Sequence, residues 1–135
     1  MHSLQVPIYP SGALVDVLIG FAAADIQERR RRGQPVPAPS PARALIDPGA
    51  EISCVDSHVL APLVAHGLLP ERYVFANLPF AGGTAPAPLY LIAMALVHPS
   101  GNQRANLILR SLPVLEQPLN QLGYEALLGR DVLAR

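Results

Sequence analysis

The most constraining feature of the sequence is an apolar run that ends in an acid, a proline and a glycine, Ala44-Leu45-Ile46-Asp47-Pro48-Gly49-Ala50. A carboxylate at the end of a buried strand is costly to desolvate unless neighbouring groups stabilise it, so Asp47 is a candidate functional residue. Gly49 has no side chain, so the backbone can come close to whatever the acid faces. Taken alone, the tripeptide also fits an ordinary turn after a strand, because proline and glycine are common turn residues.

A second motif-like segment lies near the C-terminus: Leu127-Leu128-Gly129-Arg130-Asp131-Val132-Leu133. Residues 44–50 resemble the Ala-Leu-(Leu/Ile/Val)-Asp-(Thr/Ser)-Gly-Ala signature of the retropepsin-like aspartic proteases, which include the retroviral proteases and their bacterial relatives. Residues 127–133 resemble the (Ile/Leu)-(Ile/Leu)-Gly-Arg-(Asp/Asn)-apolar-Leu segment of the same family. The resemblance frames almost the whole chain, and these two ends match residue by residue.

The resemblance implies a mainly β fold, with residues 1–135 forming a single closed barrel of the acid-protease kind with a flap hairpin and one or two short helices. It implies an aspartic endopeptidase that hydrolyses peptide bonds with a water held between two carboxylates. One such motif in 135 residues supplies only one acid, so Asp47 from each of two subunits would form the pair across a two-fold axis. The expected partners are therefore a second copy of the chain and an extended peptide or protein substrate.

The same resemblance assigns roles around the acid. Pro48, Gly49 and Ala50 form the expected active-site loop, in which the Gly49 N–H faces the acid and Ala50 leaves room for substrate. Arg130 is expected to form a bidentate pair with Glu51, or else both are separate surface charges whose pairing is worth little. The residues expected to support the loop are Glu51, Gly129, Arg130 and Asp131. The expected flap, around a Gly-Gly pair between apolar runs, is Phe80, Ala81, Gly82, Gly83 and Thr84.

Two departures from the family pattern open alternatives. Relatives carry Thr or Ser where this chain has Pro48, and the hydroxyl and N–H of that residue interlock across the two-fold axis. Proline has neither group, so a second hypothesis is a catalytically silent module for peptide binding or self-association. The chain also stops at Arg135, where relatives continue into the dimer interface, so it is either a fragment or uses other segments. A third hypothesis is a small β-rich protein unrelated to proteases, with chance matches at both ends. The family assignment requires the Asp47 turn and residues 127–133 to pack together, and it would be wrong if they lay far apart.

Apolar, β-branched runs predict strands at residues 15–21, 42–46, 73–78, 89–97, 105–109 and 112–115. Residues 14–24 also fit a buried helix by periodicity, and the resemblance favours the strand. Asp56-Ser57 predicts a helix start, with the helix over 58–66, an apolar stripe of Leu60, Leu63 and Val64, and an end at Gly67. Residues 28–41, with four arginines and four prolines, are expected to form an exposed loop that stays out of central strands.

Composition and residue spacing limit the other classes of function that the chain could have. Half the residues are apolar, and a net charge of zero indicates neither a nucleic-acid nor a membrane partner. No apolar run reaches the roughly 18 residues that span a bilayer, and no signal-peptide pattern is present, so a cytoplasmic location is expected. The four histidines, His2, His58, His66 and His98, lack metal-ligand spacing, so neither metal nor cofactor is expected. Cys54, the single cysteine, fits a small buried hydrophobe better than a nucleophile.

Overall fold

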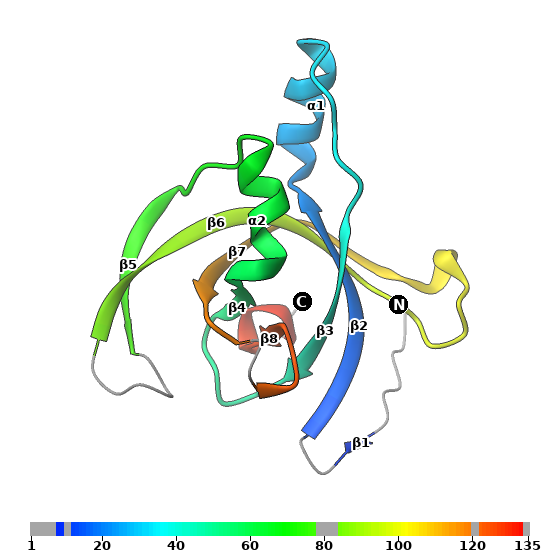
Figure 1. The fold of residues 1–135 in the computed structure, drawn as a ribbon. Helices are drawn as coiled ribbons and strands as arrows, with labels where there is room; N and C mark the ends of the chain where they lie inside the picture. The colour runs from blue at the N-terminus through cyan, green and yellow to red at the C-terminus, as the bar shows by residue number, and fades with distance from the viewer. Residues whose placement is uncertain (1–7, 10–11, 78–83, 120–121, 134–135) are drawn as a thin grey trace.

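The computed structural model describes residues 8–9, 12–77, 84–119 and 122–133, and its centre is a closed β-barrel (Figure 1). The elements are β1 (Ile8–Tyr9), β2 (Gly12–Phe21), α1 (Ala23–Arg31), β3 (Ser40–Ile46), β4 (Ser53–Asp56), α2 (Ser57–Ala65), β5 (Arg72–Asn77), β6 (Thr84–Leu96), the 3-10 turn η1 (Gln103–Ala105), β7 (Leu107–Gln117), β8 (Ala126–Leu128) and α3 (Arg130–Leu133). Hydrogen-bonded neighbours run β2-β3-β8-β4-β7-β6 and return to β2, which closes a ring of six strands. The expected mainly β, closed-barrel fold with short helices is confirmed at this level.

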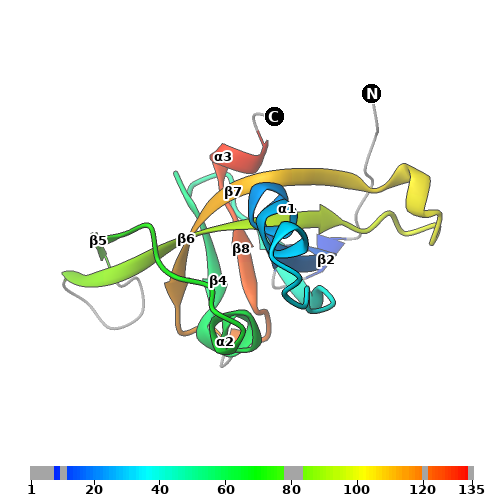
Figure 2. The same cartoon turned by 90° about the horizontal axis from the view of Figure 1, so that it is seen from above.

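The strand pairing brings the two ends of the chain together. β3 and β8 run parallel, with Ile46 opposite Leu128, and β4 pairs antiparallel with β8, with Cys54 opposite Leu127. β8 therefore lies between the strand that enters the Asp47 turn and the strand that follows it. The short helix α3 leaves β8 on one side of the barrel, and α2 lies on the other (Figure 2). The chain segments around residues 47 and 129 are thus neighbours in space.

Alternating residues of the long strands fill the barrel. In β2, Val15, Val17, Ile19 and Phe21 are buried, as the strand prediction for residues 15–21 requires, so the helical alternative there is wrong. Side chains of β6, which pairs with β2, and of β7 fill the interior with them, led by Ile92, Met94, Leu112 and Val114. Each fully buried Leu or Ile contributes about 1.5–3 kcal/mol relative to an exposed one. Burial of these apolar side chains is therefore the main contribution to the stability of the barrel.

Helix α2 closes one side of this core and starts where the sequence indicates. The Asp56 carboxylate accepts a hydrogen bond from the His58 N–H at 2.9 Å, which caps the helix. Val59, Leu60 and Leu63 are buried against the barrel. Val64, expected on the same stripe, is 41% exposed, because Val59 occupies the core-facing position instead. The predicted helix is confirmed, with one member of its apolar face corrected.

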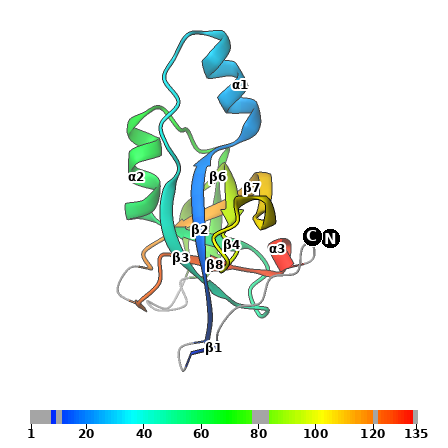
Figure 3. The ribbon, with the colours of Figure 1, turned by 90° about the vertical axis from the view of Figure 1, so that its right-hand side faces the viewer.

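Residues 28–41 are not the single loop expected from their arginines and prolines. Helix α1 runs to Arg31, projects from one end of the barrel (Figures 1 and 3) and is stabilised on its surface by Glu28. The Glu28 carboxylate contacts the guanidinium groups of Arg31 at 2.6 Å and Arg32 at 2.7 Å. Ion pairs three and four residues apart support an exposed helix, so the helix forms although arginines and prolines predict a loop.

Proline placement also differs from the expectation. Pro41 lies inside β3, opposite Leu18 of β2. Its missing N–H is tolerated because β8 pairs with β3 at residues 44–46, beyond the proline. The two strands expected at 105–109 and 112–115 form one continuous β7, in which Pro113 lies opposite Leu91.

Among the described residues, no helix has the length and apolar character required to cross a membrane.

Candidate active site

Asp47 follows the last residue of β3 and sits in a tight turn. Its side chain is half-buried, and its Oδ1 atom accepts a hydrogen bond from the Gly49 N–H at 3.0 Å. The Ala50 N–H donates to the Asp47 carbonyl at 3.1 Å, which closes the turn. The Asp47 N–H donates to the Leu128 carbonyl at 2.9 Å, which ties the turn to β8. The turn and its carboxylate are therefore held by backbone hydrogen bonds, and the carboxylate remains partly open to solvent.

The Gly129 corner packs directly against this turn. A Cβ atom on Gly129 would lie 2.7 Å from the Ala50 carbonyl oxygen and 3.1 Å from the Ile52 carbonyl oxygen, both backbone atoms. The next residue, Arg130, donates its backbone N–H to the same Ala50 carbonyl at 2.8 Å. Glycine is therefore required here by close approach of two backbones. The two motif-like segments therefore lie in contact.

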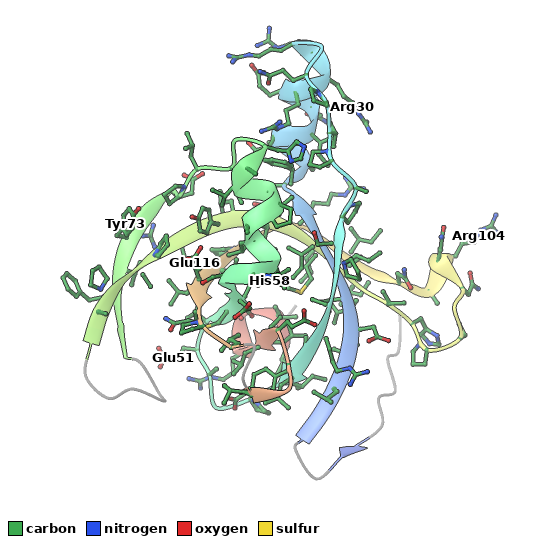
Figure 4. All side chains as sticks on the ribbon, viewed as in Figure 1. Arg30, Glu51, His58, Tyr73, Arg104 and Glu116 are labelled. Carbon is green, nitrogen blue, oxygen red and sulfur yellow. The ribbon has the colours of Figure 1, made fainter. Side chains whose placement is uncertain are left out.

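The expected Arg130–Glu51 pair is present in a weaker form than the bidentate one. Arg130 Nη2 lies 3.4 Å from Glu51 Oε1, and the two side chains are 61% and 87% exposed. Glu51 extends from the surface of its loop in Figure 4. Exposed pairs of this kind contribute between zero and about 1 kcal/mol. The backbone contacts to Leu128 and Arg130, rather than this ion pair, therefore hold the base of the loop.

Ser53 is a site residue that is not predicted from the sequence. Its side chain is fully buried, and its Oγ donates to Asp131 Oδ1 at 2.7 Å and accepts from the Gly129 N–H at 3.0 Å. Its N–H donates to Asp131 Oδ2 at 3.1 Å. Through these bonds to Ser53, Asp131 supports the Gly129 corner, which is the role expected for it. A polar residue within the apolar stretch 52–55 is the signal that points to Ser53.

An apolar surface lies beside the turn, apart from the main core. Ala87, Leu89 and Leu115 form a buried cluster, and half-buried Ile52, Cys54 and Val74 pack against it. This cluster links β4 to the hairpin of β5 and β6. Within the expected flap, Thr84 begins β6 and pairs with Asn77, and Phe80, Ala81, Gly82 and Gly83 lie outside the described residues. In the sheet, β7 lies between β4 and this hairpin, so the hairpin contacts β4 through the side chains of the cluster.

Two titratable groups near the turn have shifted pKa values. Burial raises the pKa of the Cys54 thiol to about 11, and the negative charge of Asp131 adds to the rise. Burial also raises the pKa of the Tyr124 hydroxyl, with a contribution from the charge of Asp47. The Cys54 thiol is mainly protonated at neutral pH and is a poor nucleophile.

Cys54 is expected to react slowly with thiol reagents in the folded protein. Its pKa lies about two units above the ordinary 9.0, so at pH 8 its thiolate fraction is about 100-fold lower than that of an unperturbed cysteine. The folded protein should therefore alkylate about 100-fold more slowly than the same chain in denaturant. A pH–rate profile with a small haloacetamide checks this, and a folded-state rate that levels off near pH 9 would contradict the shift.

The three histidines in the described part of the chain lie at different places in the fold. His58 and His66 are at opposite ends of α2, and His98 bonds to Ser100 Oγ through Nδ1 at 2.8 Å in the turn after β6. His2 lies outside the described residues. In the described ranges, no group of three or more His, Cys, Asp or Glu side chains is arranged to hold a metal ion.

Comparisons of this chain with protein-family models, with curated proteins and with solved structures found no match. Its own residues and their geometry are therefore the basis for assigning a function.

Proposed function

We propose that the chain is an aspartic endopeptidase of the retropepsin-like kind, whose active site forms when two copies meet at Asp47. The observation that carries the proposal is the contact between the two motif-like segments. The Asp47 N–H bonds to the Leu128 carbonyl, and the Arg130 N–H bonds to the Ala50 carbonyl. Two segments about 80 residues apart in sequence thus form one rigid base under a half-buried carboxylate. This arrangement fits a catalytic acid better than a turn with no further role.

The chemistry requires two carboxylates that share one proton. Two carboxylates in close contact cannot both ionise, so the pair titrates as a unit. The ionised Asp47 takes a proton from water, which attacks the scissile carbonyl, and the protonated Asp47 of the second copy hydrogen-bonds to the carbonyl oxygen. The Gly49 N–H, 3.0 Å from Asp47 Oδ1, donates a hydrogen bond that holds the carboxylate in its orientation. The site is incomplete in one copy, so activity and dimer formation are linked.

The surroundings of the turn favour extended peptides with apolar side chains next to the cleaved bond. An extended chain adds to exposed strand edges through main-chain hydrogen bonds, and neighbouring side chains set its preference. The half-buried Ile52, Cys54 and Val74 supply an apolar surface beside the turn. Thr84 and the preceding flap residues would cover the bound peptide.

The proposal is tested by incubating the purified chain with an unstructured protein at mildly acidic pH. Cleavage next to apolar residues, blocked by a statine-type transition-state mimic, is the expected result. Sedimentation in the same buffer should show a dimer, strengthened by the mimic. Strictly monomeric protein in the presence of the mimic would refute a shared active site.

A catalytically silent module is the second candidate, and Pro48 is the observation that favours it. Pro48 is exposed at the tip of the turn and supplies neither the N–H nor the hydroxyl that would join two copies across the axis. The turn itself keeps its shape, because proline fixes its own φ angle and Gly49 still bonds to Asp47. On this second hypothesis the chain binds peptides or itself and leaves them intact.

Replacing Pro48 by threonine separates the two candidates. Under the endopeptidase proposal the wild type cleaves, and Pro48→Thr raises kcat/KM by about 10-fold or more, because the acids are better held in register. Peptide cleavage by both proteins at equal concentration is the measurement. An inert wild type together with an active Pro48→Thr would establish the silent module, and cleavage by the wild type would exclude it.

A further inference from the structure

We infer that Ser53 and Asp131 form a buried positioning pair that holds the Asp47 turn in place. The pair lies beneath the turn, between β4 and α3, and Ser53 is fully buried. It acts through backbone groups and touches no reacting atom. Its effect on catalysis rests on the proposed function, whereas its effect on the turn does not.

The hydrogen bonds of Ser53 have a fixed direction. A hydroxyl has one hydrogen, and here it goes to Asp131 Oδ1 at 2.7 Å, which leaves a lone pair for the Gly129 N–H at 3.0 Å. The Ser53 N–H uses the other oxygen, Oδ2, at 3.1 Å. Asp131 Oδ1 also accepts the Val132 N–H at 2.9 Å. The Asp131 carboxylate thus accepts hydrogen bonds on both of its oxygens.

The pair is connected to both ends of the turn through Gly129. The residue before Gly129, Leu128, accepts the Asp47 N–H at 2.9 Å. The residue after it, Arg130, donates to the Ala50 carbonyl at 2.8 Å. If the Gly129 N–H loses its hydrogen bond to Ser53, the backbone on either side of Gly129 is held less firmly. The two hydrogen bonds that join Leu128 and Arg130 to the turn are then weakened as well. A misplacement of about 1 Å at a catalytic group can lower a rate about 100-fold.

The buried pair is a better positioning device than the neighbouring ion pair. Bonds to an ionised carboxylate are about twice as strong as neutral ones, and a buried bond is costly to break. The Arg130–Glu51 contact is long and both side chains are largely exposed, so solvent and salt weaken it. Loss of Ser53 should therefore disturb the turn more than loss of Glu51.

The test is Ser53→Ala in the full chain, read by backbone amide exchange and by kinetics. The variant should speed exchange of the Asp47, Gly129 and Arg130 amides by about 10-fold or more, relative to core amides such as that of Ile92. Where the wild type cleaves, kcat should fall by about 10-fold or more, with KM within about threefold. Glu51→Gln should have a smaller effect, and Ser111→Ala, at an exposed serine of β7, should leave both readouts unchanged.

A double variant separates a coupled pair from two unrelated residues. Ser53→Ala/Asp131→Asn should lose little beyond the worse single variant, because both changes break one unit. Fully additive losses, a uniform rise in exchange over all amides, or an unchanged kcat in an active enzyme would each overturn the positioning role. If the wild type does not cleave, the proposed function fails while local exchange still decides the role of the pair. If Ser53→Ala does not fold, the same readouts on Asp131→Asn decide it.

Discussion

Asp47→Asn is expected to lower kcat/KM for peptide cleavage by about 1000-fold or more. An amide neither accepts the proton of the attacking water nor donates one as an acid, and acid–base catalysis alone contributes about 100- to 10,000-fold. The fold should survive, because the asparagine carbonyl oxygen still accepts the Gly49 N–H that now lies 3.0 Å from Oδ1. The melting temperature should stay within about 2 °C of the wild type.

The matched control is Asp16→Asn, which removes one carboxylate from an exposed position on β2. Both variants change the net charge equally, so a loss of activity in the Asp47 variant alone identifies the site. Equal cleavage by Asp47→Asn and the wild type, measured on the same unstructured protein, would remove Asp47 from the mechanism.

A mixing experiment extends this prediction to the shared site. If subunits exchange at random, adding an equal amount of Asp47→Asn to the wild type converts half of the wild-type subunits into mixed dimers with one acid. Activity should then fall to about half, although the amount of wild-type chain is unchanged. A chain that acts alone would keep its full activity under the same addition.

The sequence predicts the parts of this fold where local pattern and tertiary context agree. Alternating apolar residues mark β2, and Asp56-Ser57 marks the start of α2. The pairing of the Asp47 turn with the Gly129 corner follows from the motif resemblance, and the described contacts are consistent with it. The sequence shows Ser53 as a polar residue in an apolar strand, but its role depends on the hydrogen bond to Asp131, 78 residues away, which the sequence does not show.

Helix α1 shows why local pattern fails elsewhere. Its arginine run followed by prolines indicates a loop, and none of its nine described residues is buried. Long-range contacts secure it: the Arg29 guanidinium lies 4.0 Å from the centre of the Phe21 ring and donates to the carbonyls of Pro35 and His66. Arg30 points away from the barrel (Figure 4). A cation–π contact of this kind contributes about 0.5–1 kcal/mol, and spacing in the sequence does not reveal it.

Asp56→Ala is expected to lower the free energy of unfolding by about 3 kcal/mol. Asp56 is 2% exposed, and its carboxylate accepts the His58 N–H at 2.9 Å and the Leu119 N–H at 2.7 Å. Loss of a helix cap costs about 0.5–2 kcal/mol, and a buried N–H left without an acceptor costs about 1–3 kcal/mol. The Leu119 N–H loses this acceptor next to a side chain that is 3% exposed. Alanine therefore weakens the start of α2 and the segment after β7 together.

Denaturant unfolding at one protein concentration measures this loss. Asp56→Asn should cost less than alanine, because its amide oxygen still accepts one of the two N–H groups while its NH2 faces the other. Asp25→Ala, at an exposed aspartate of α1, is the matched control and should change the free energy by less than about 0.5 kcal/mol. A cost below about 1 kcal/mol for Asp56→Ala would mean that water replaces the carboxylate, and that the end of β4 is open to solvent rather than closed by the chain that follows β7.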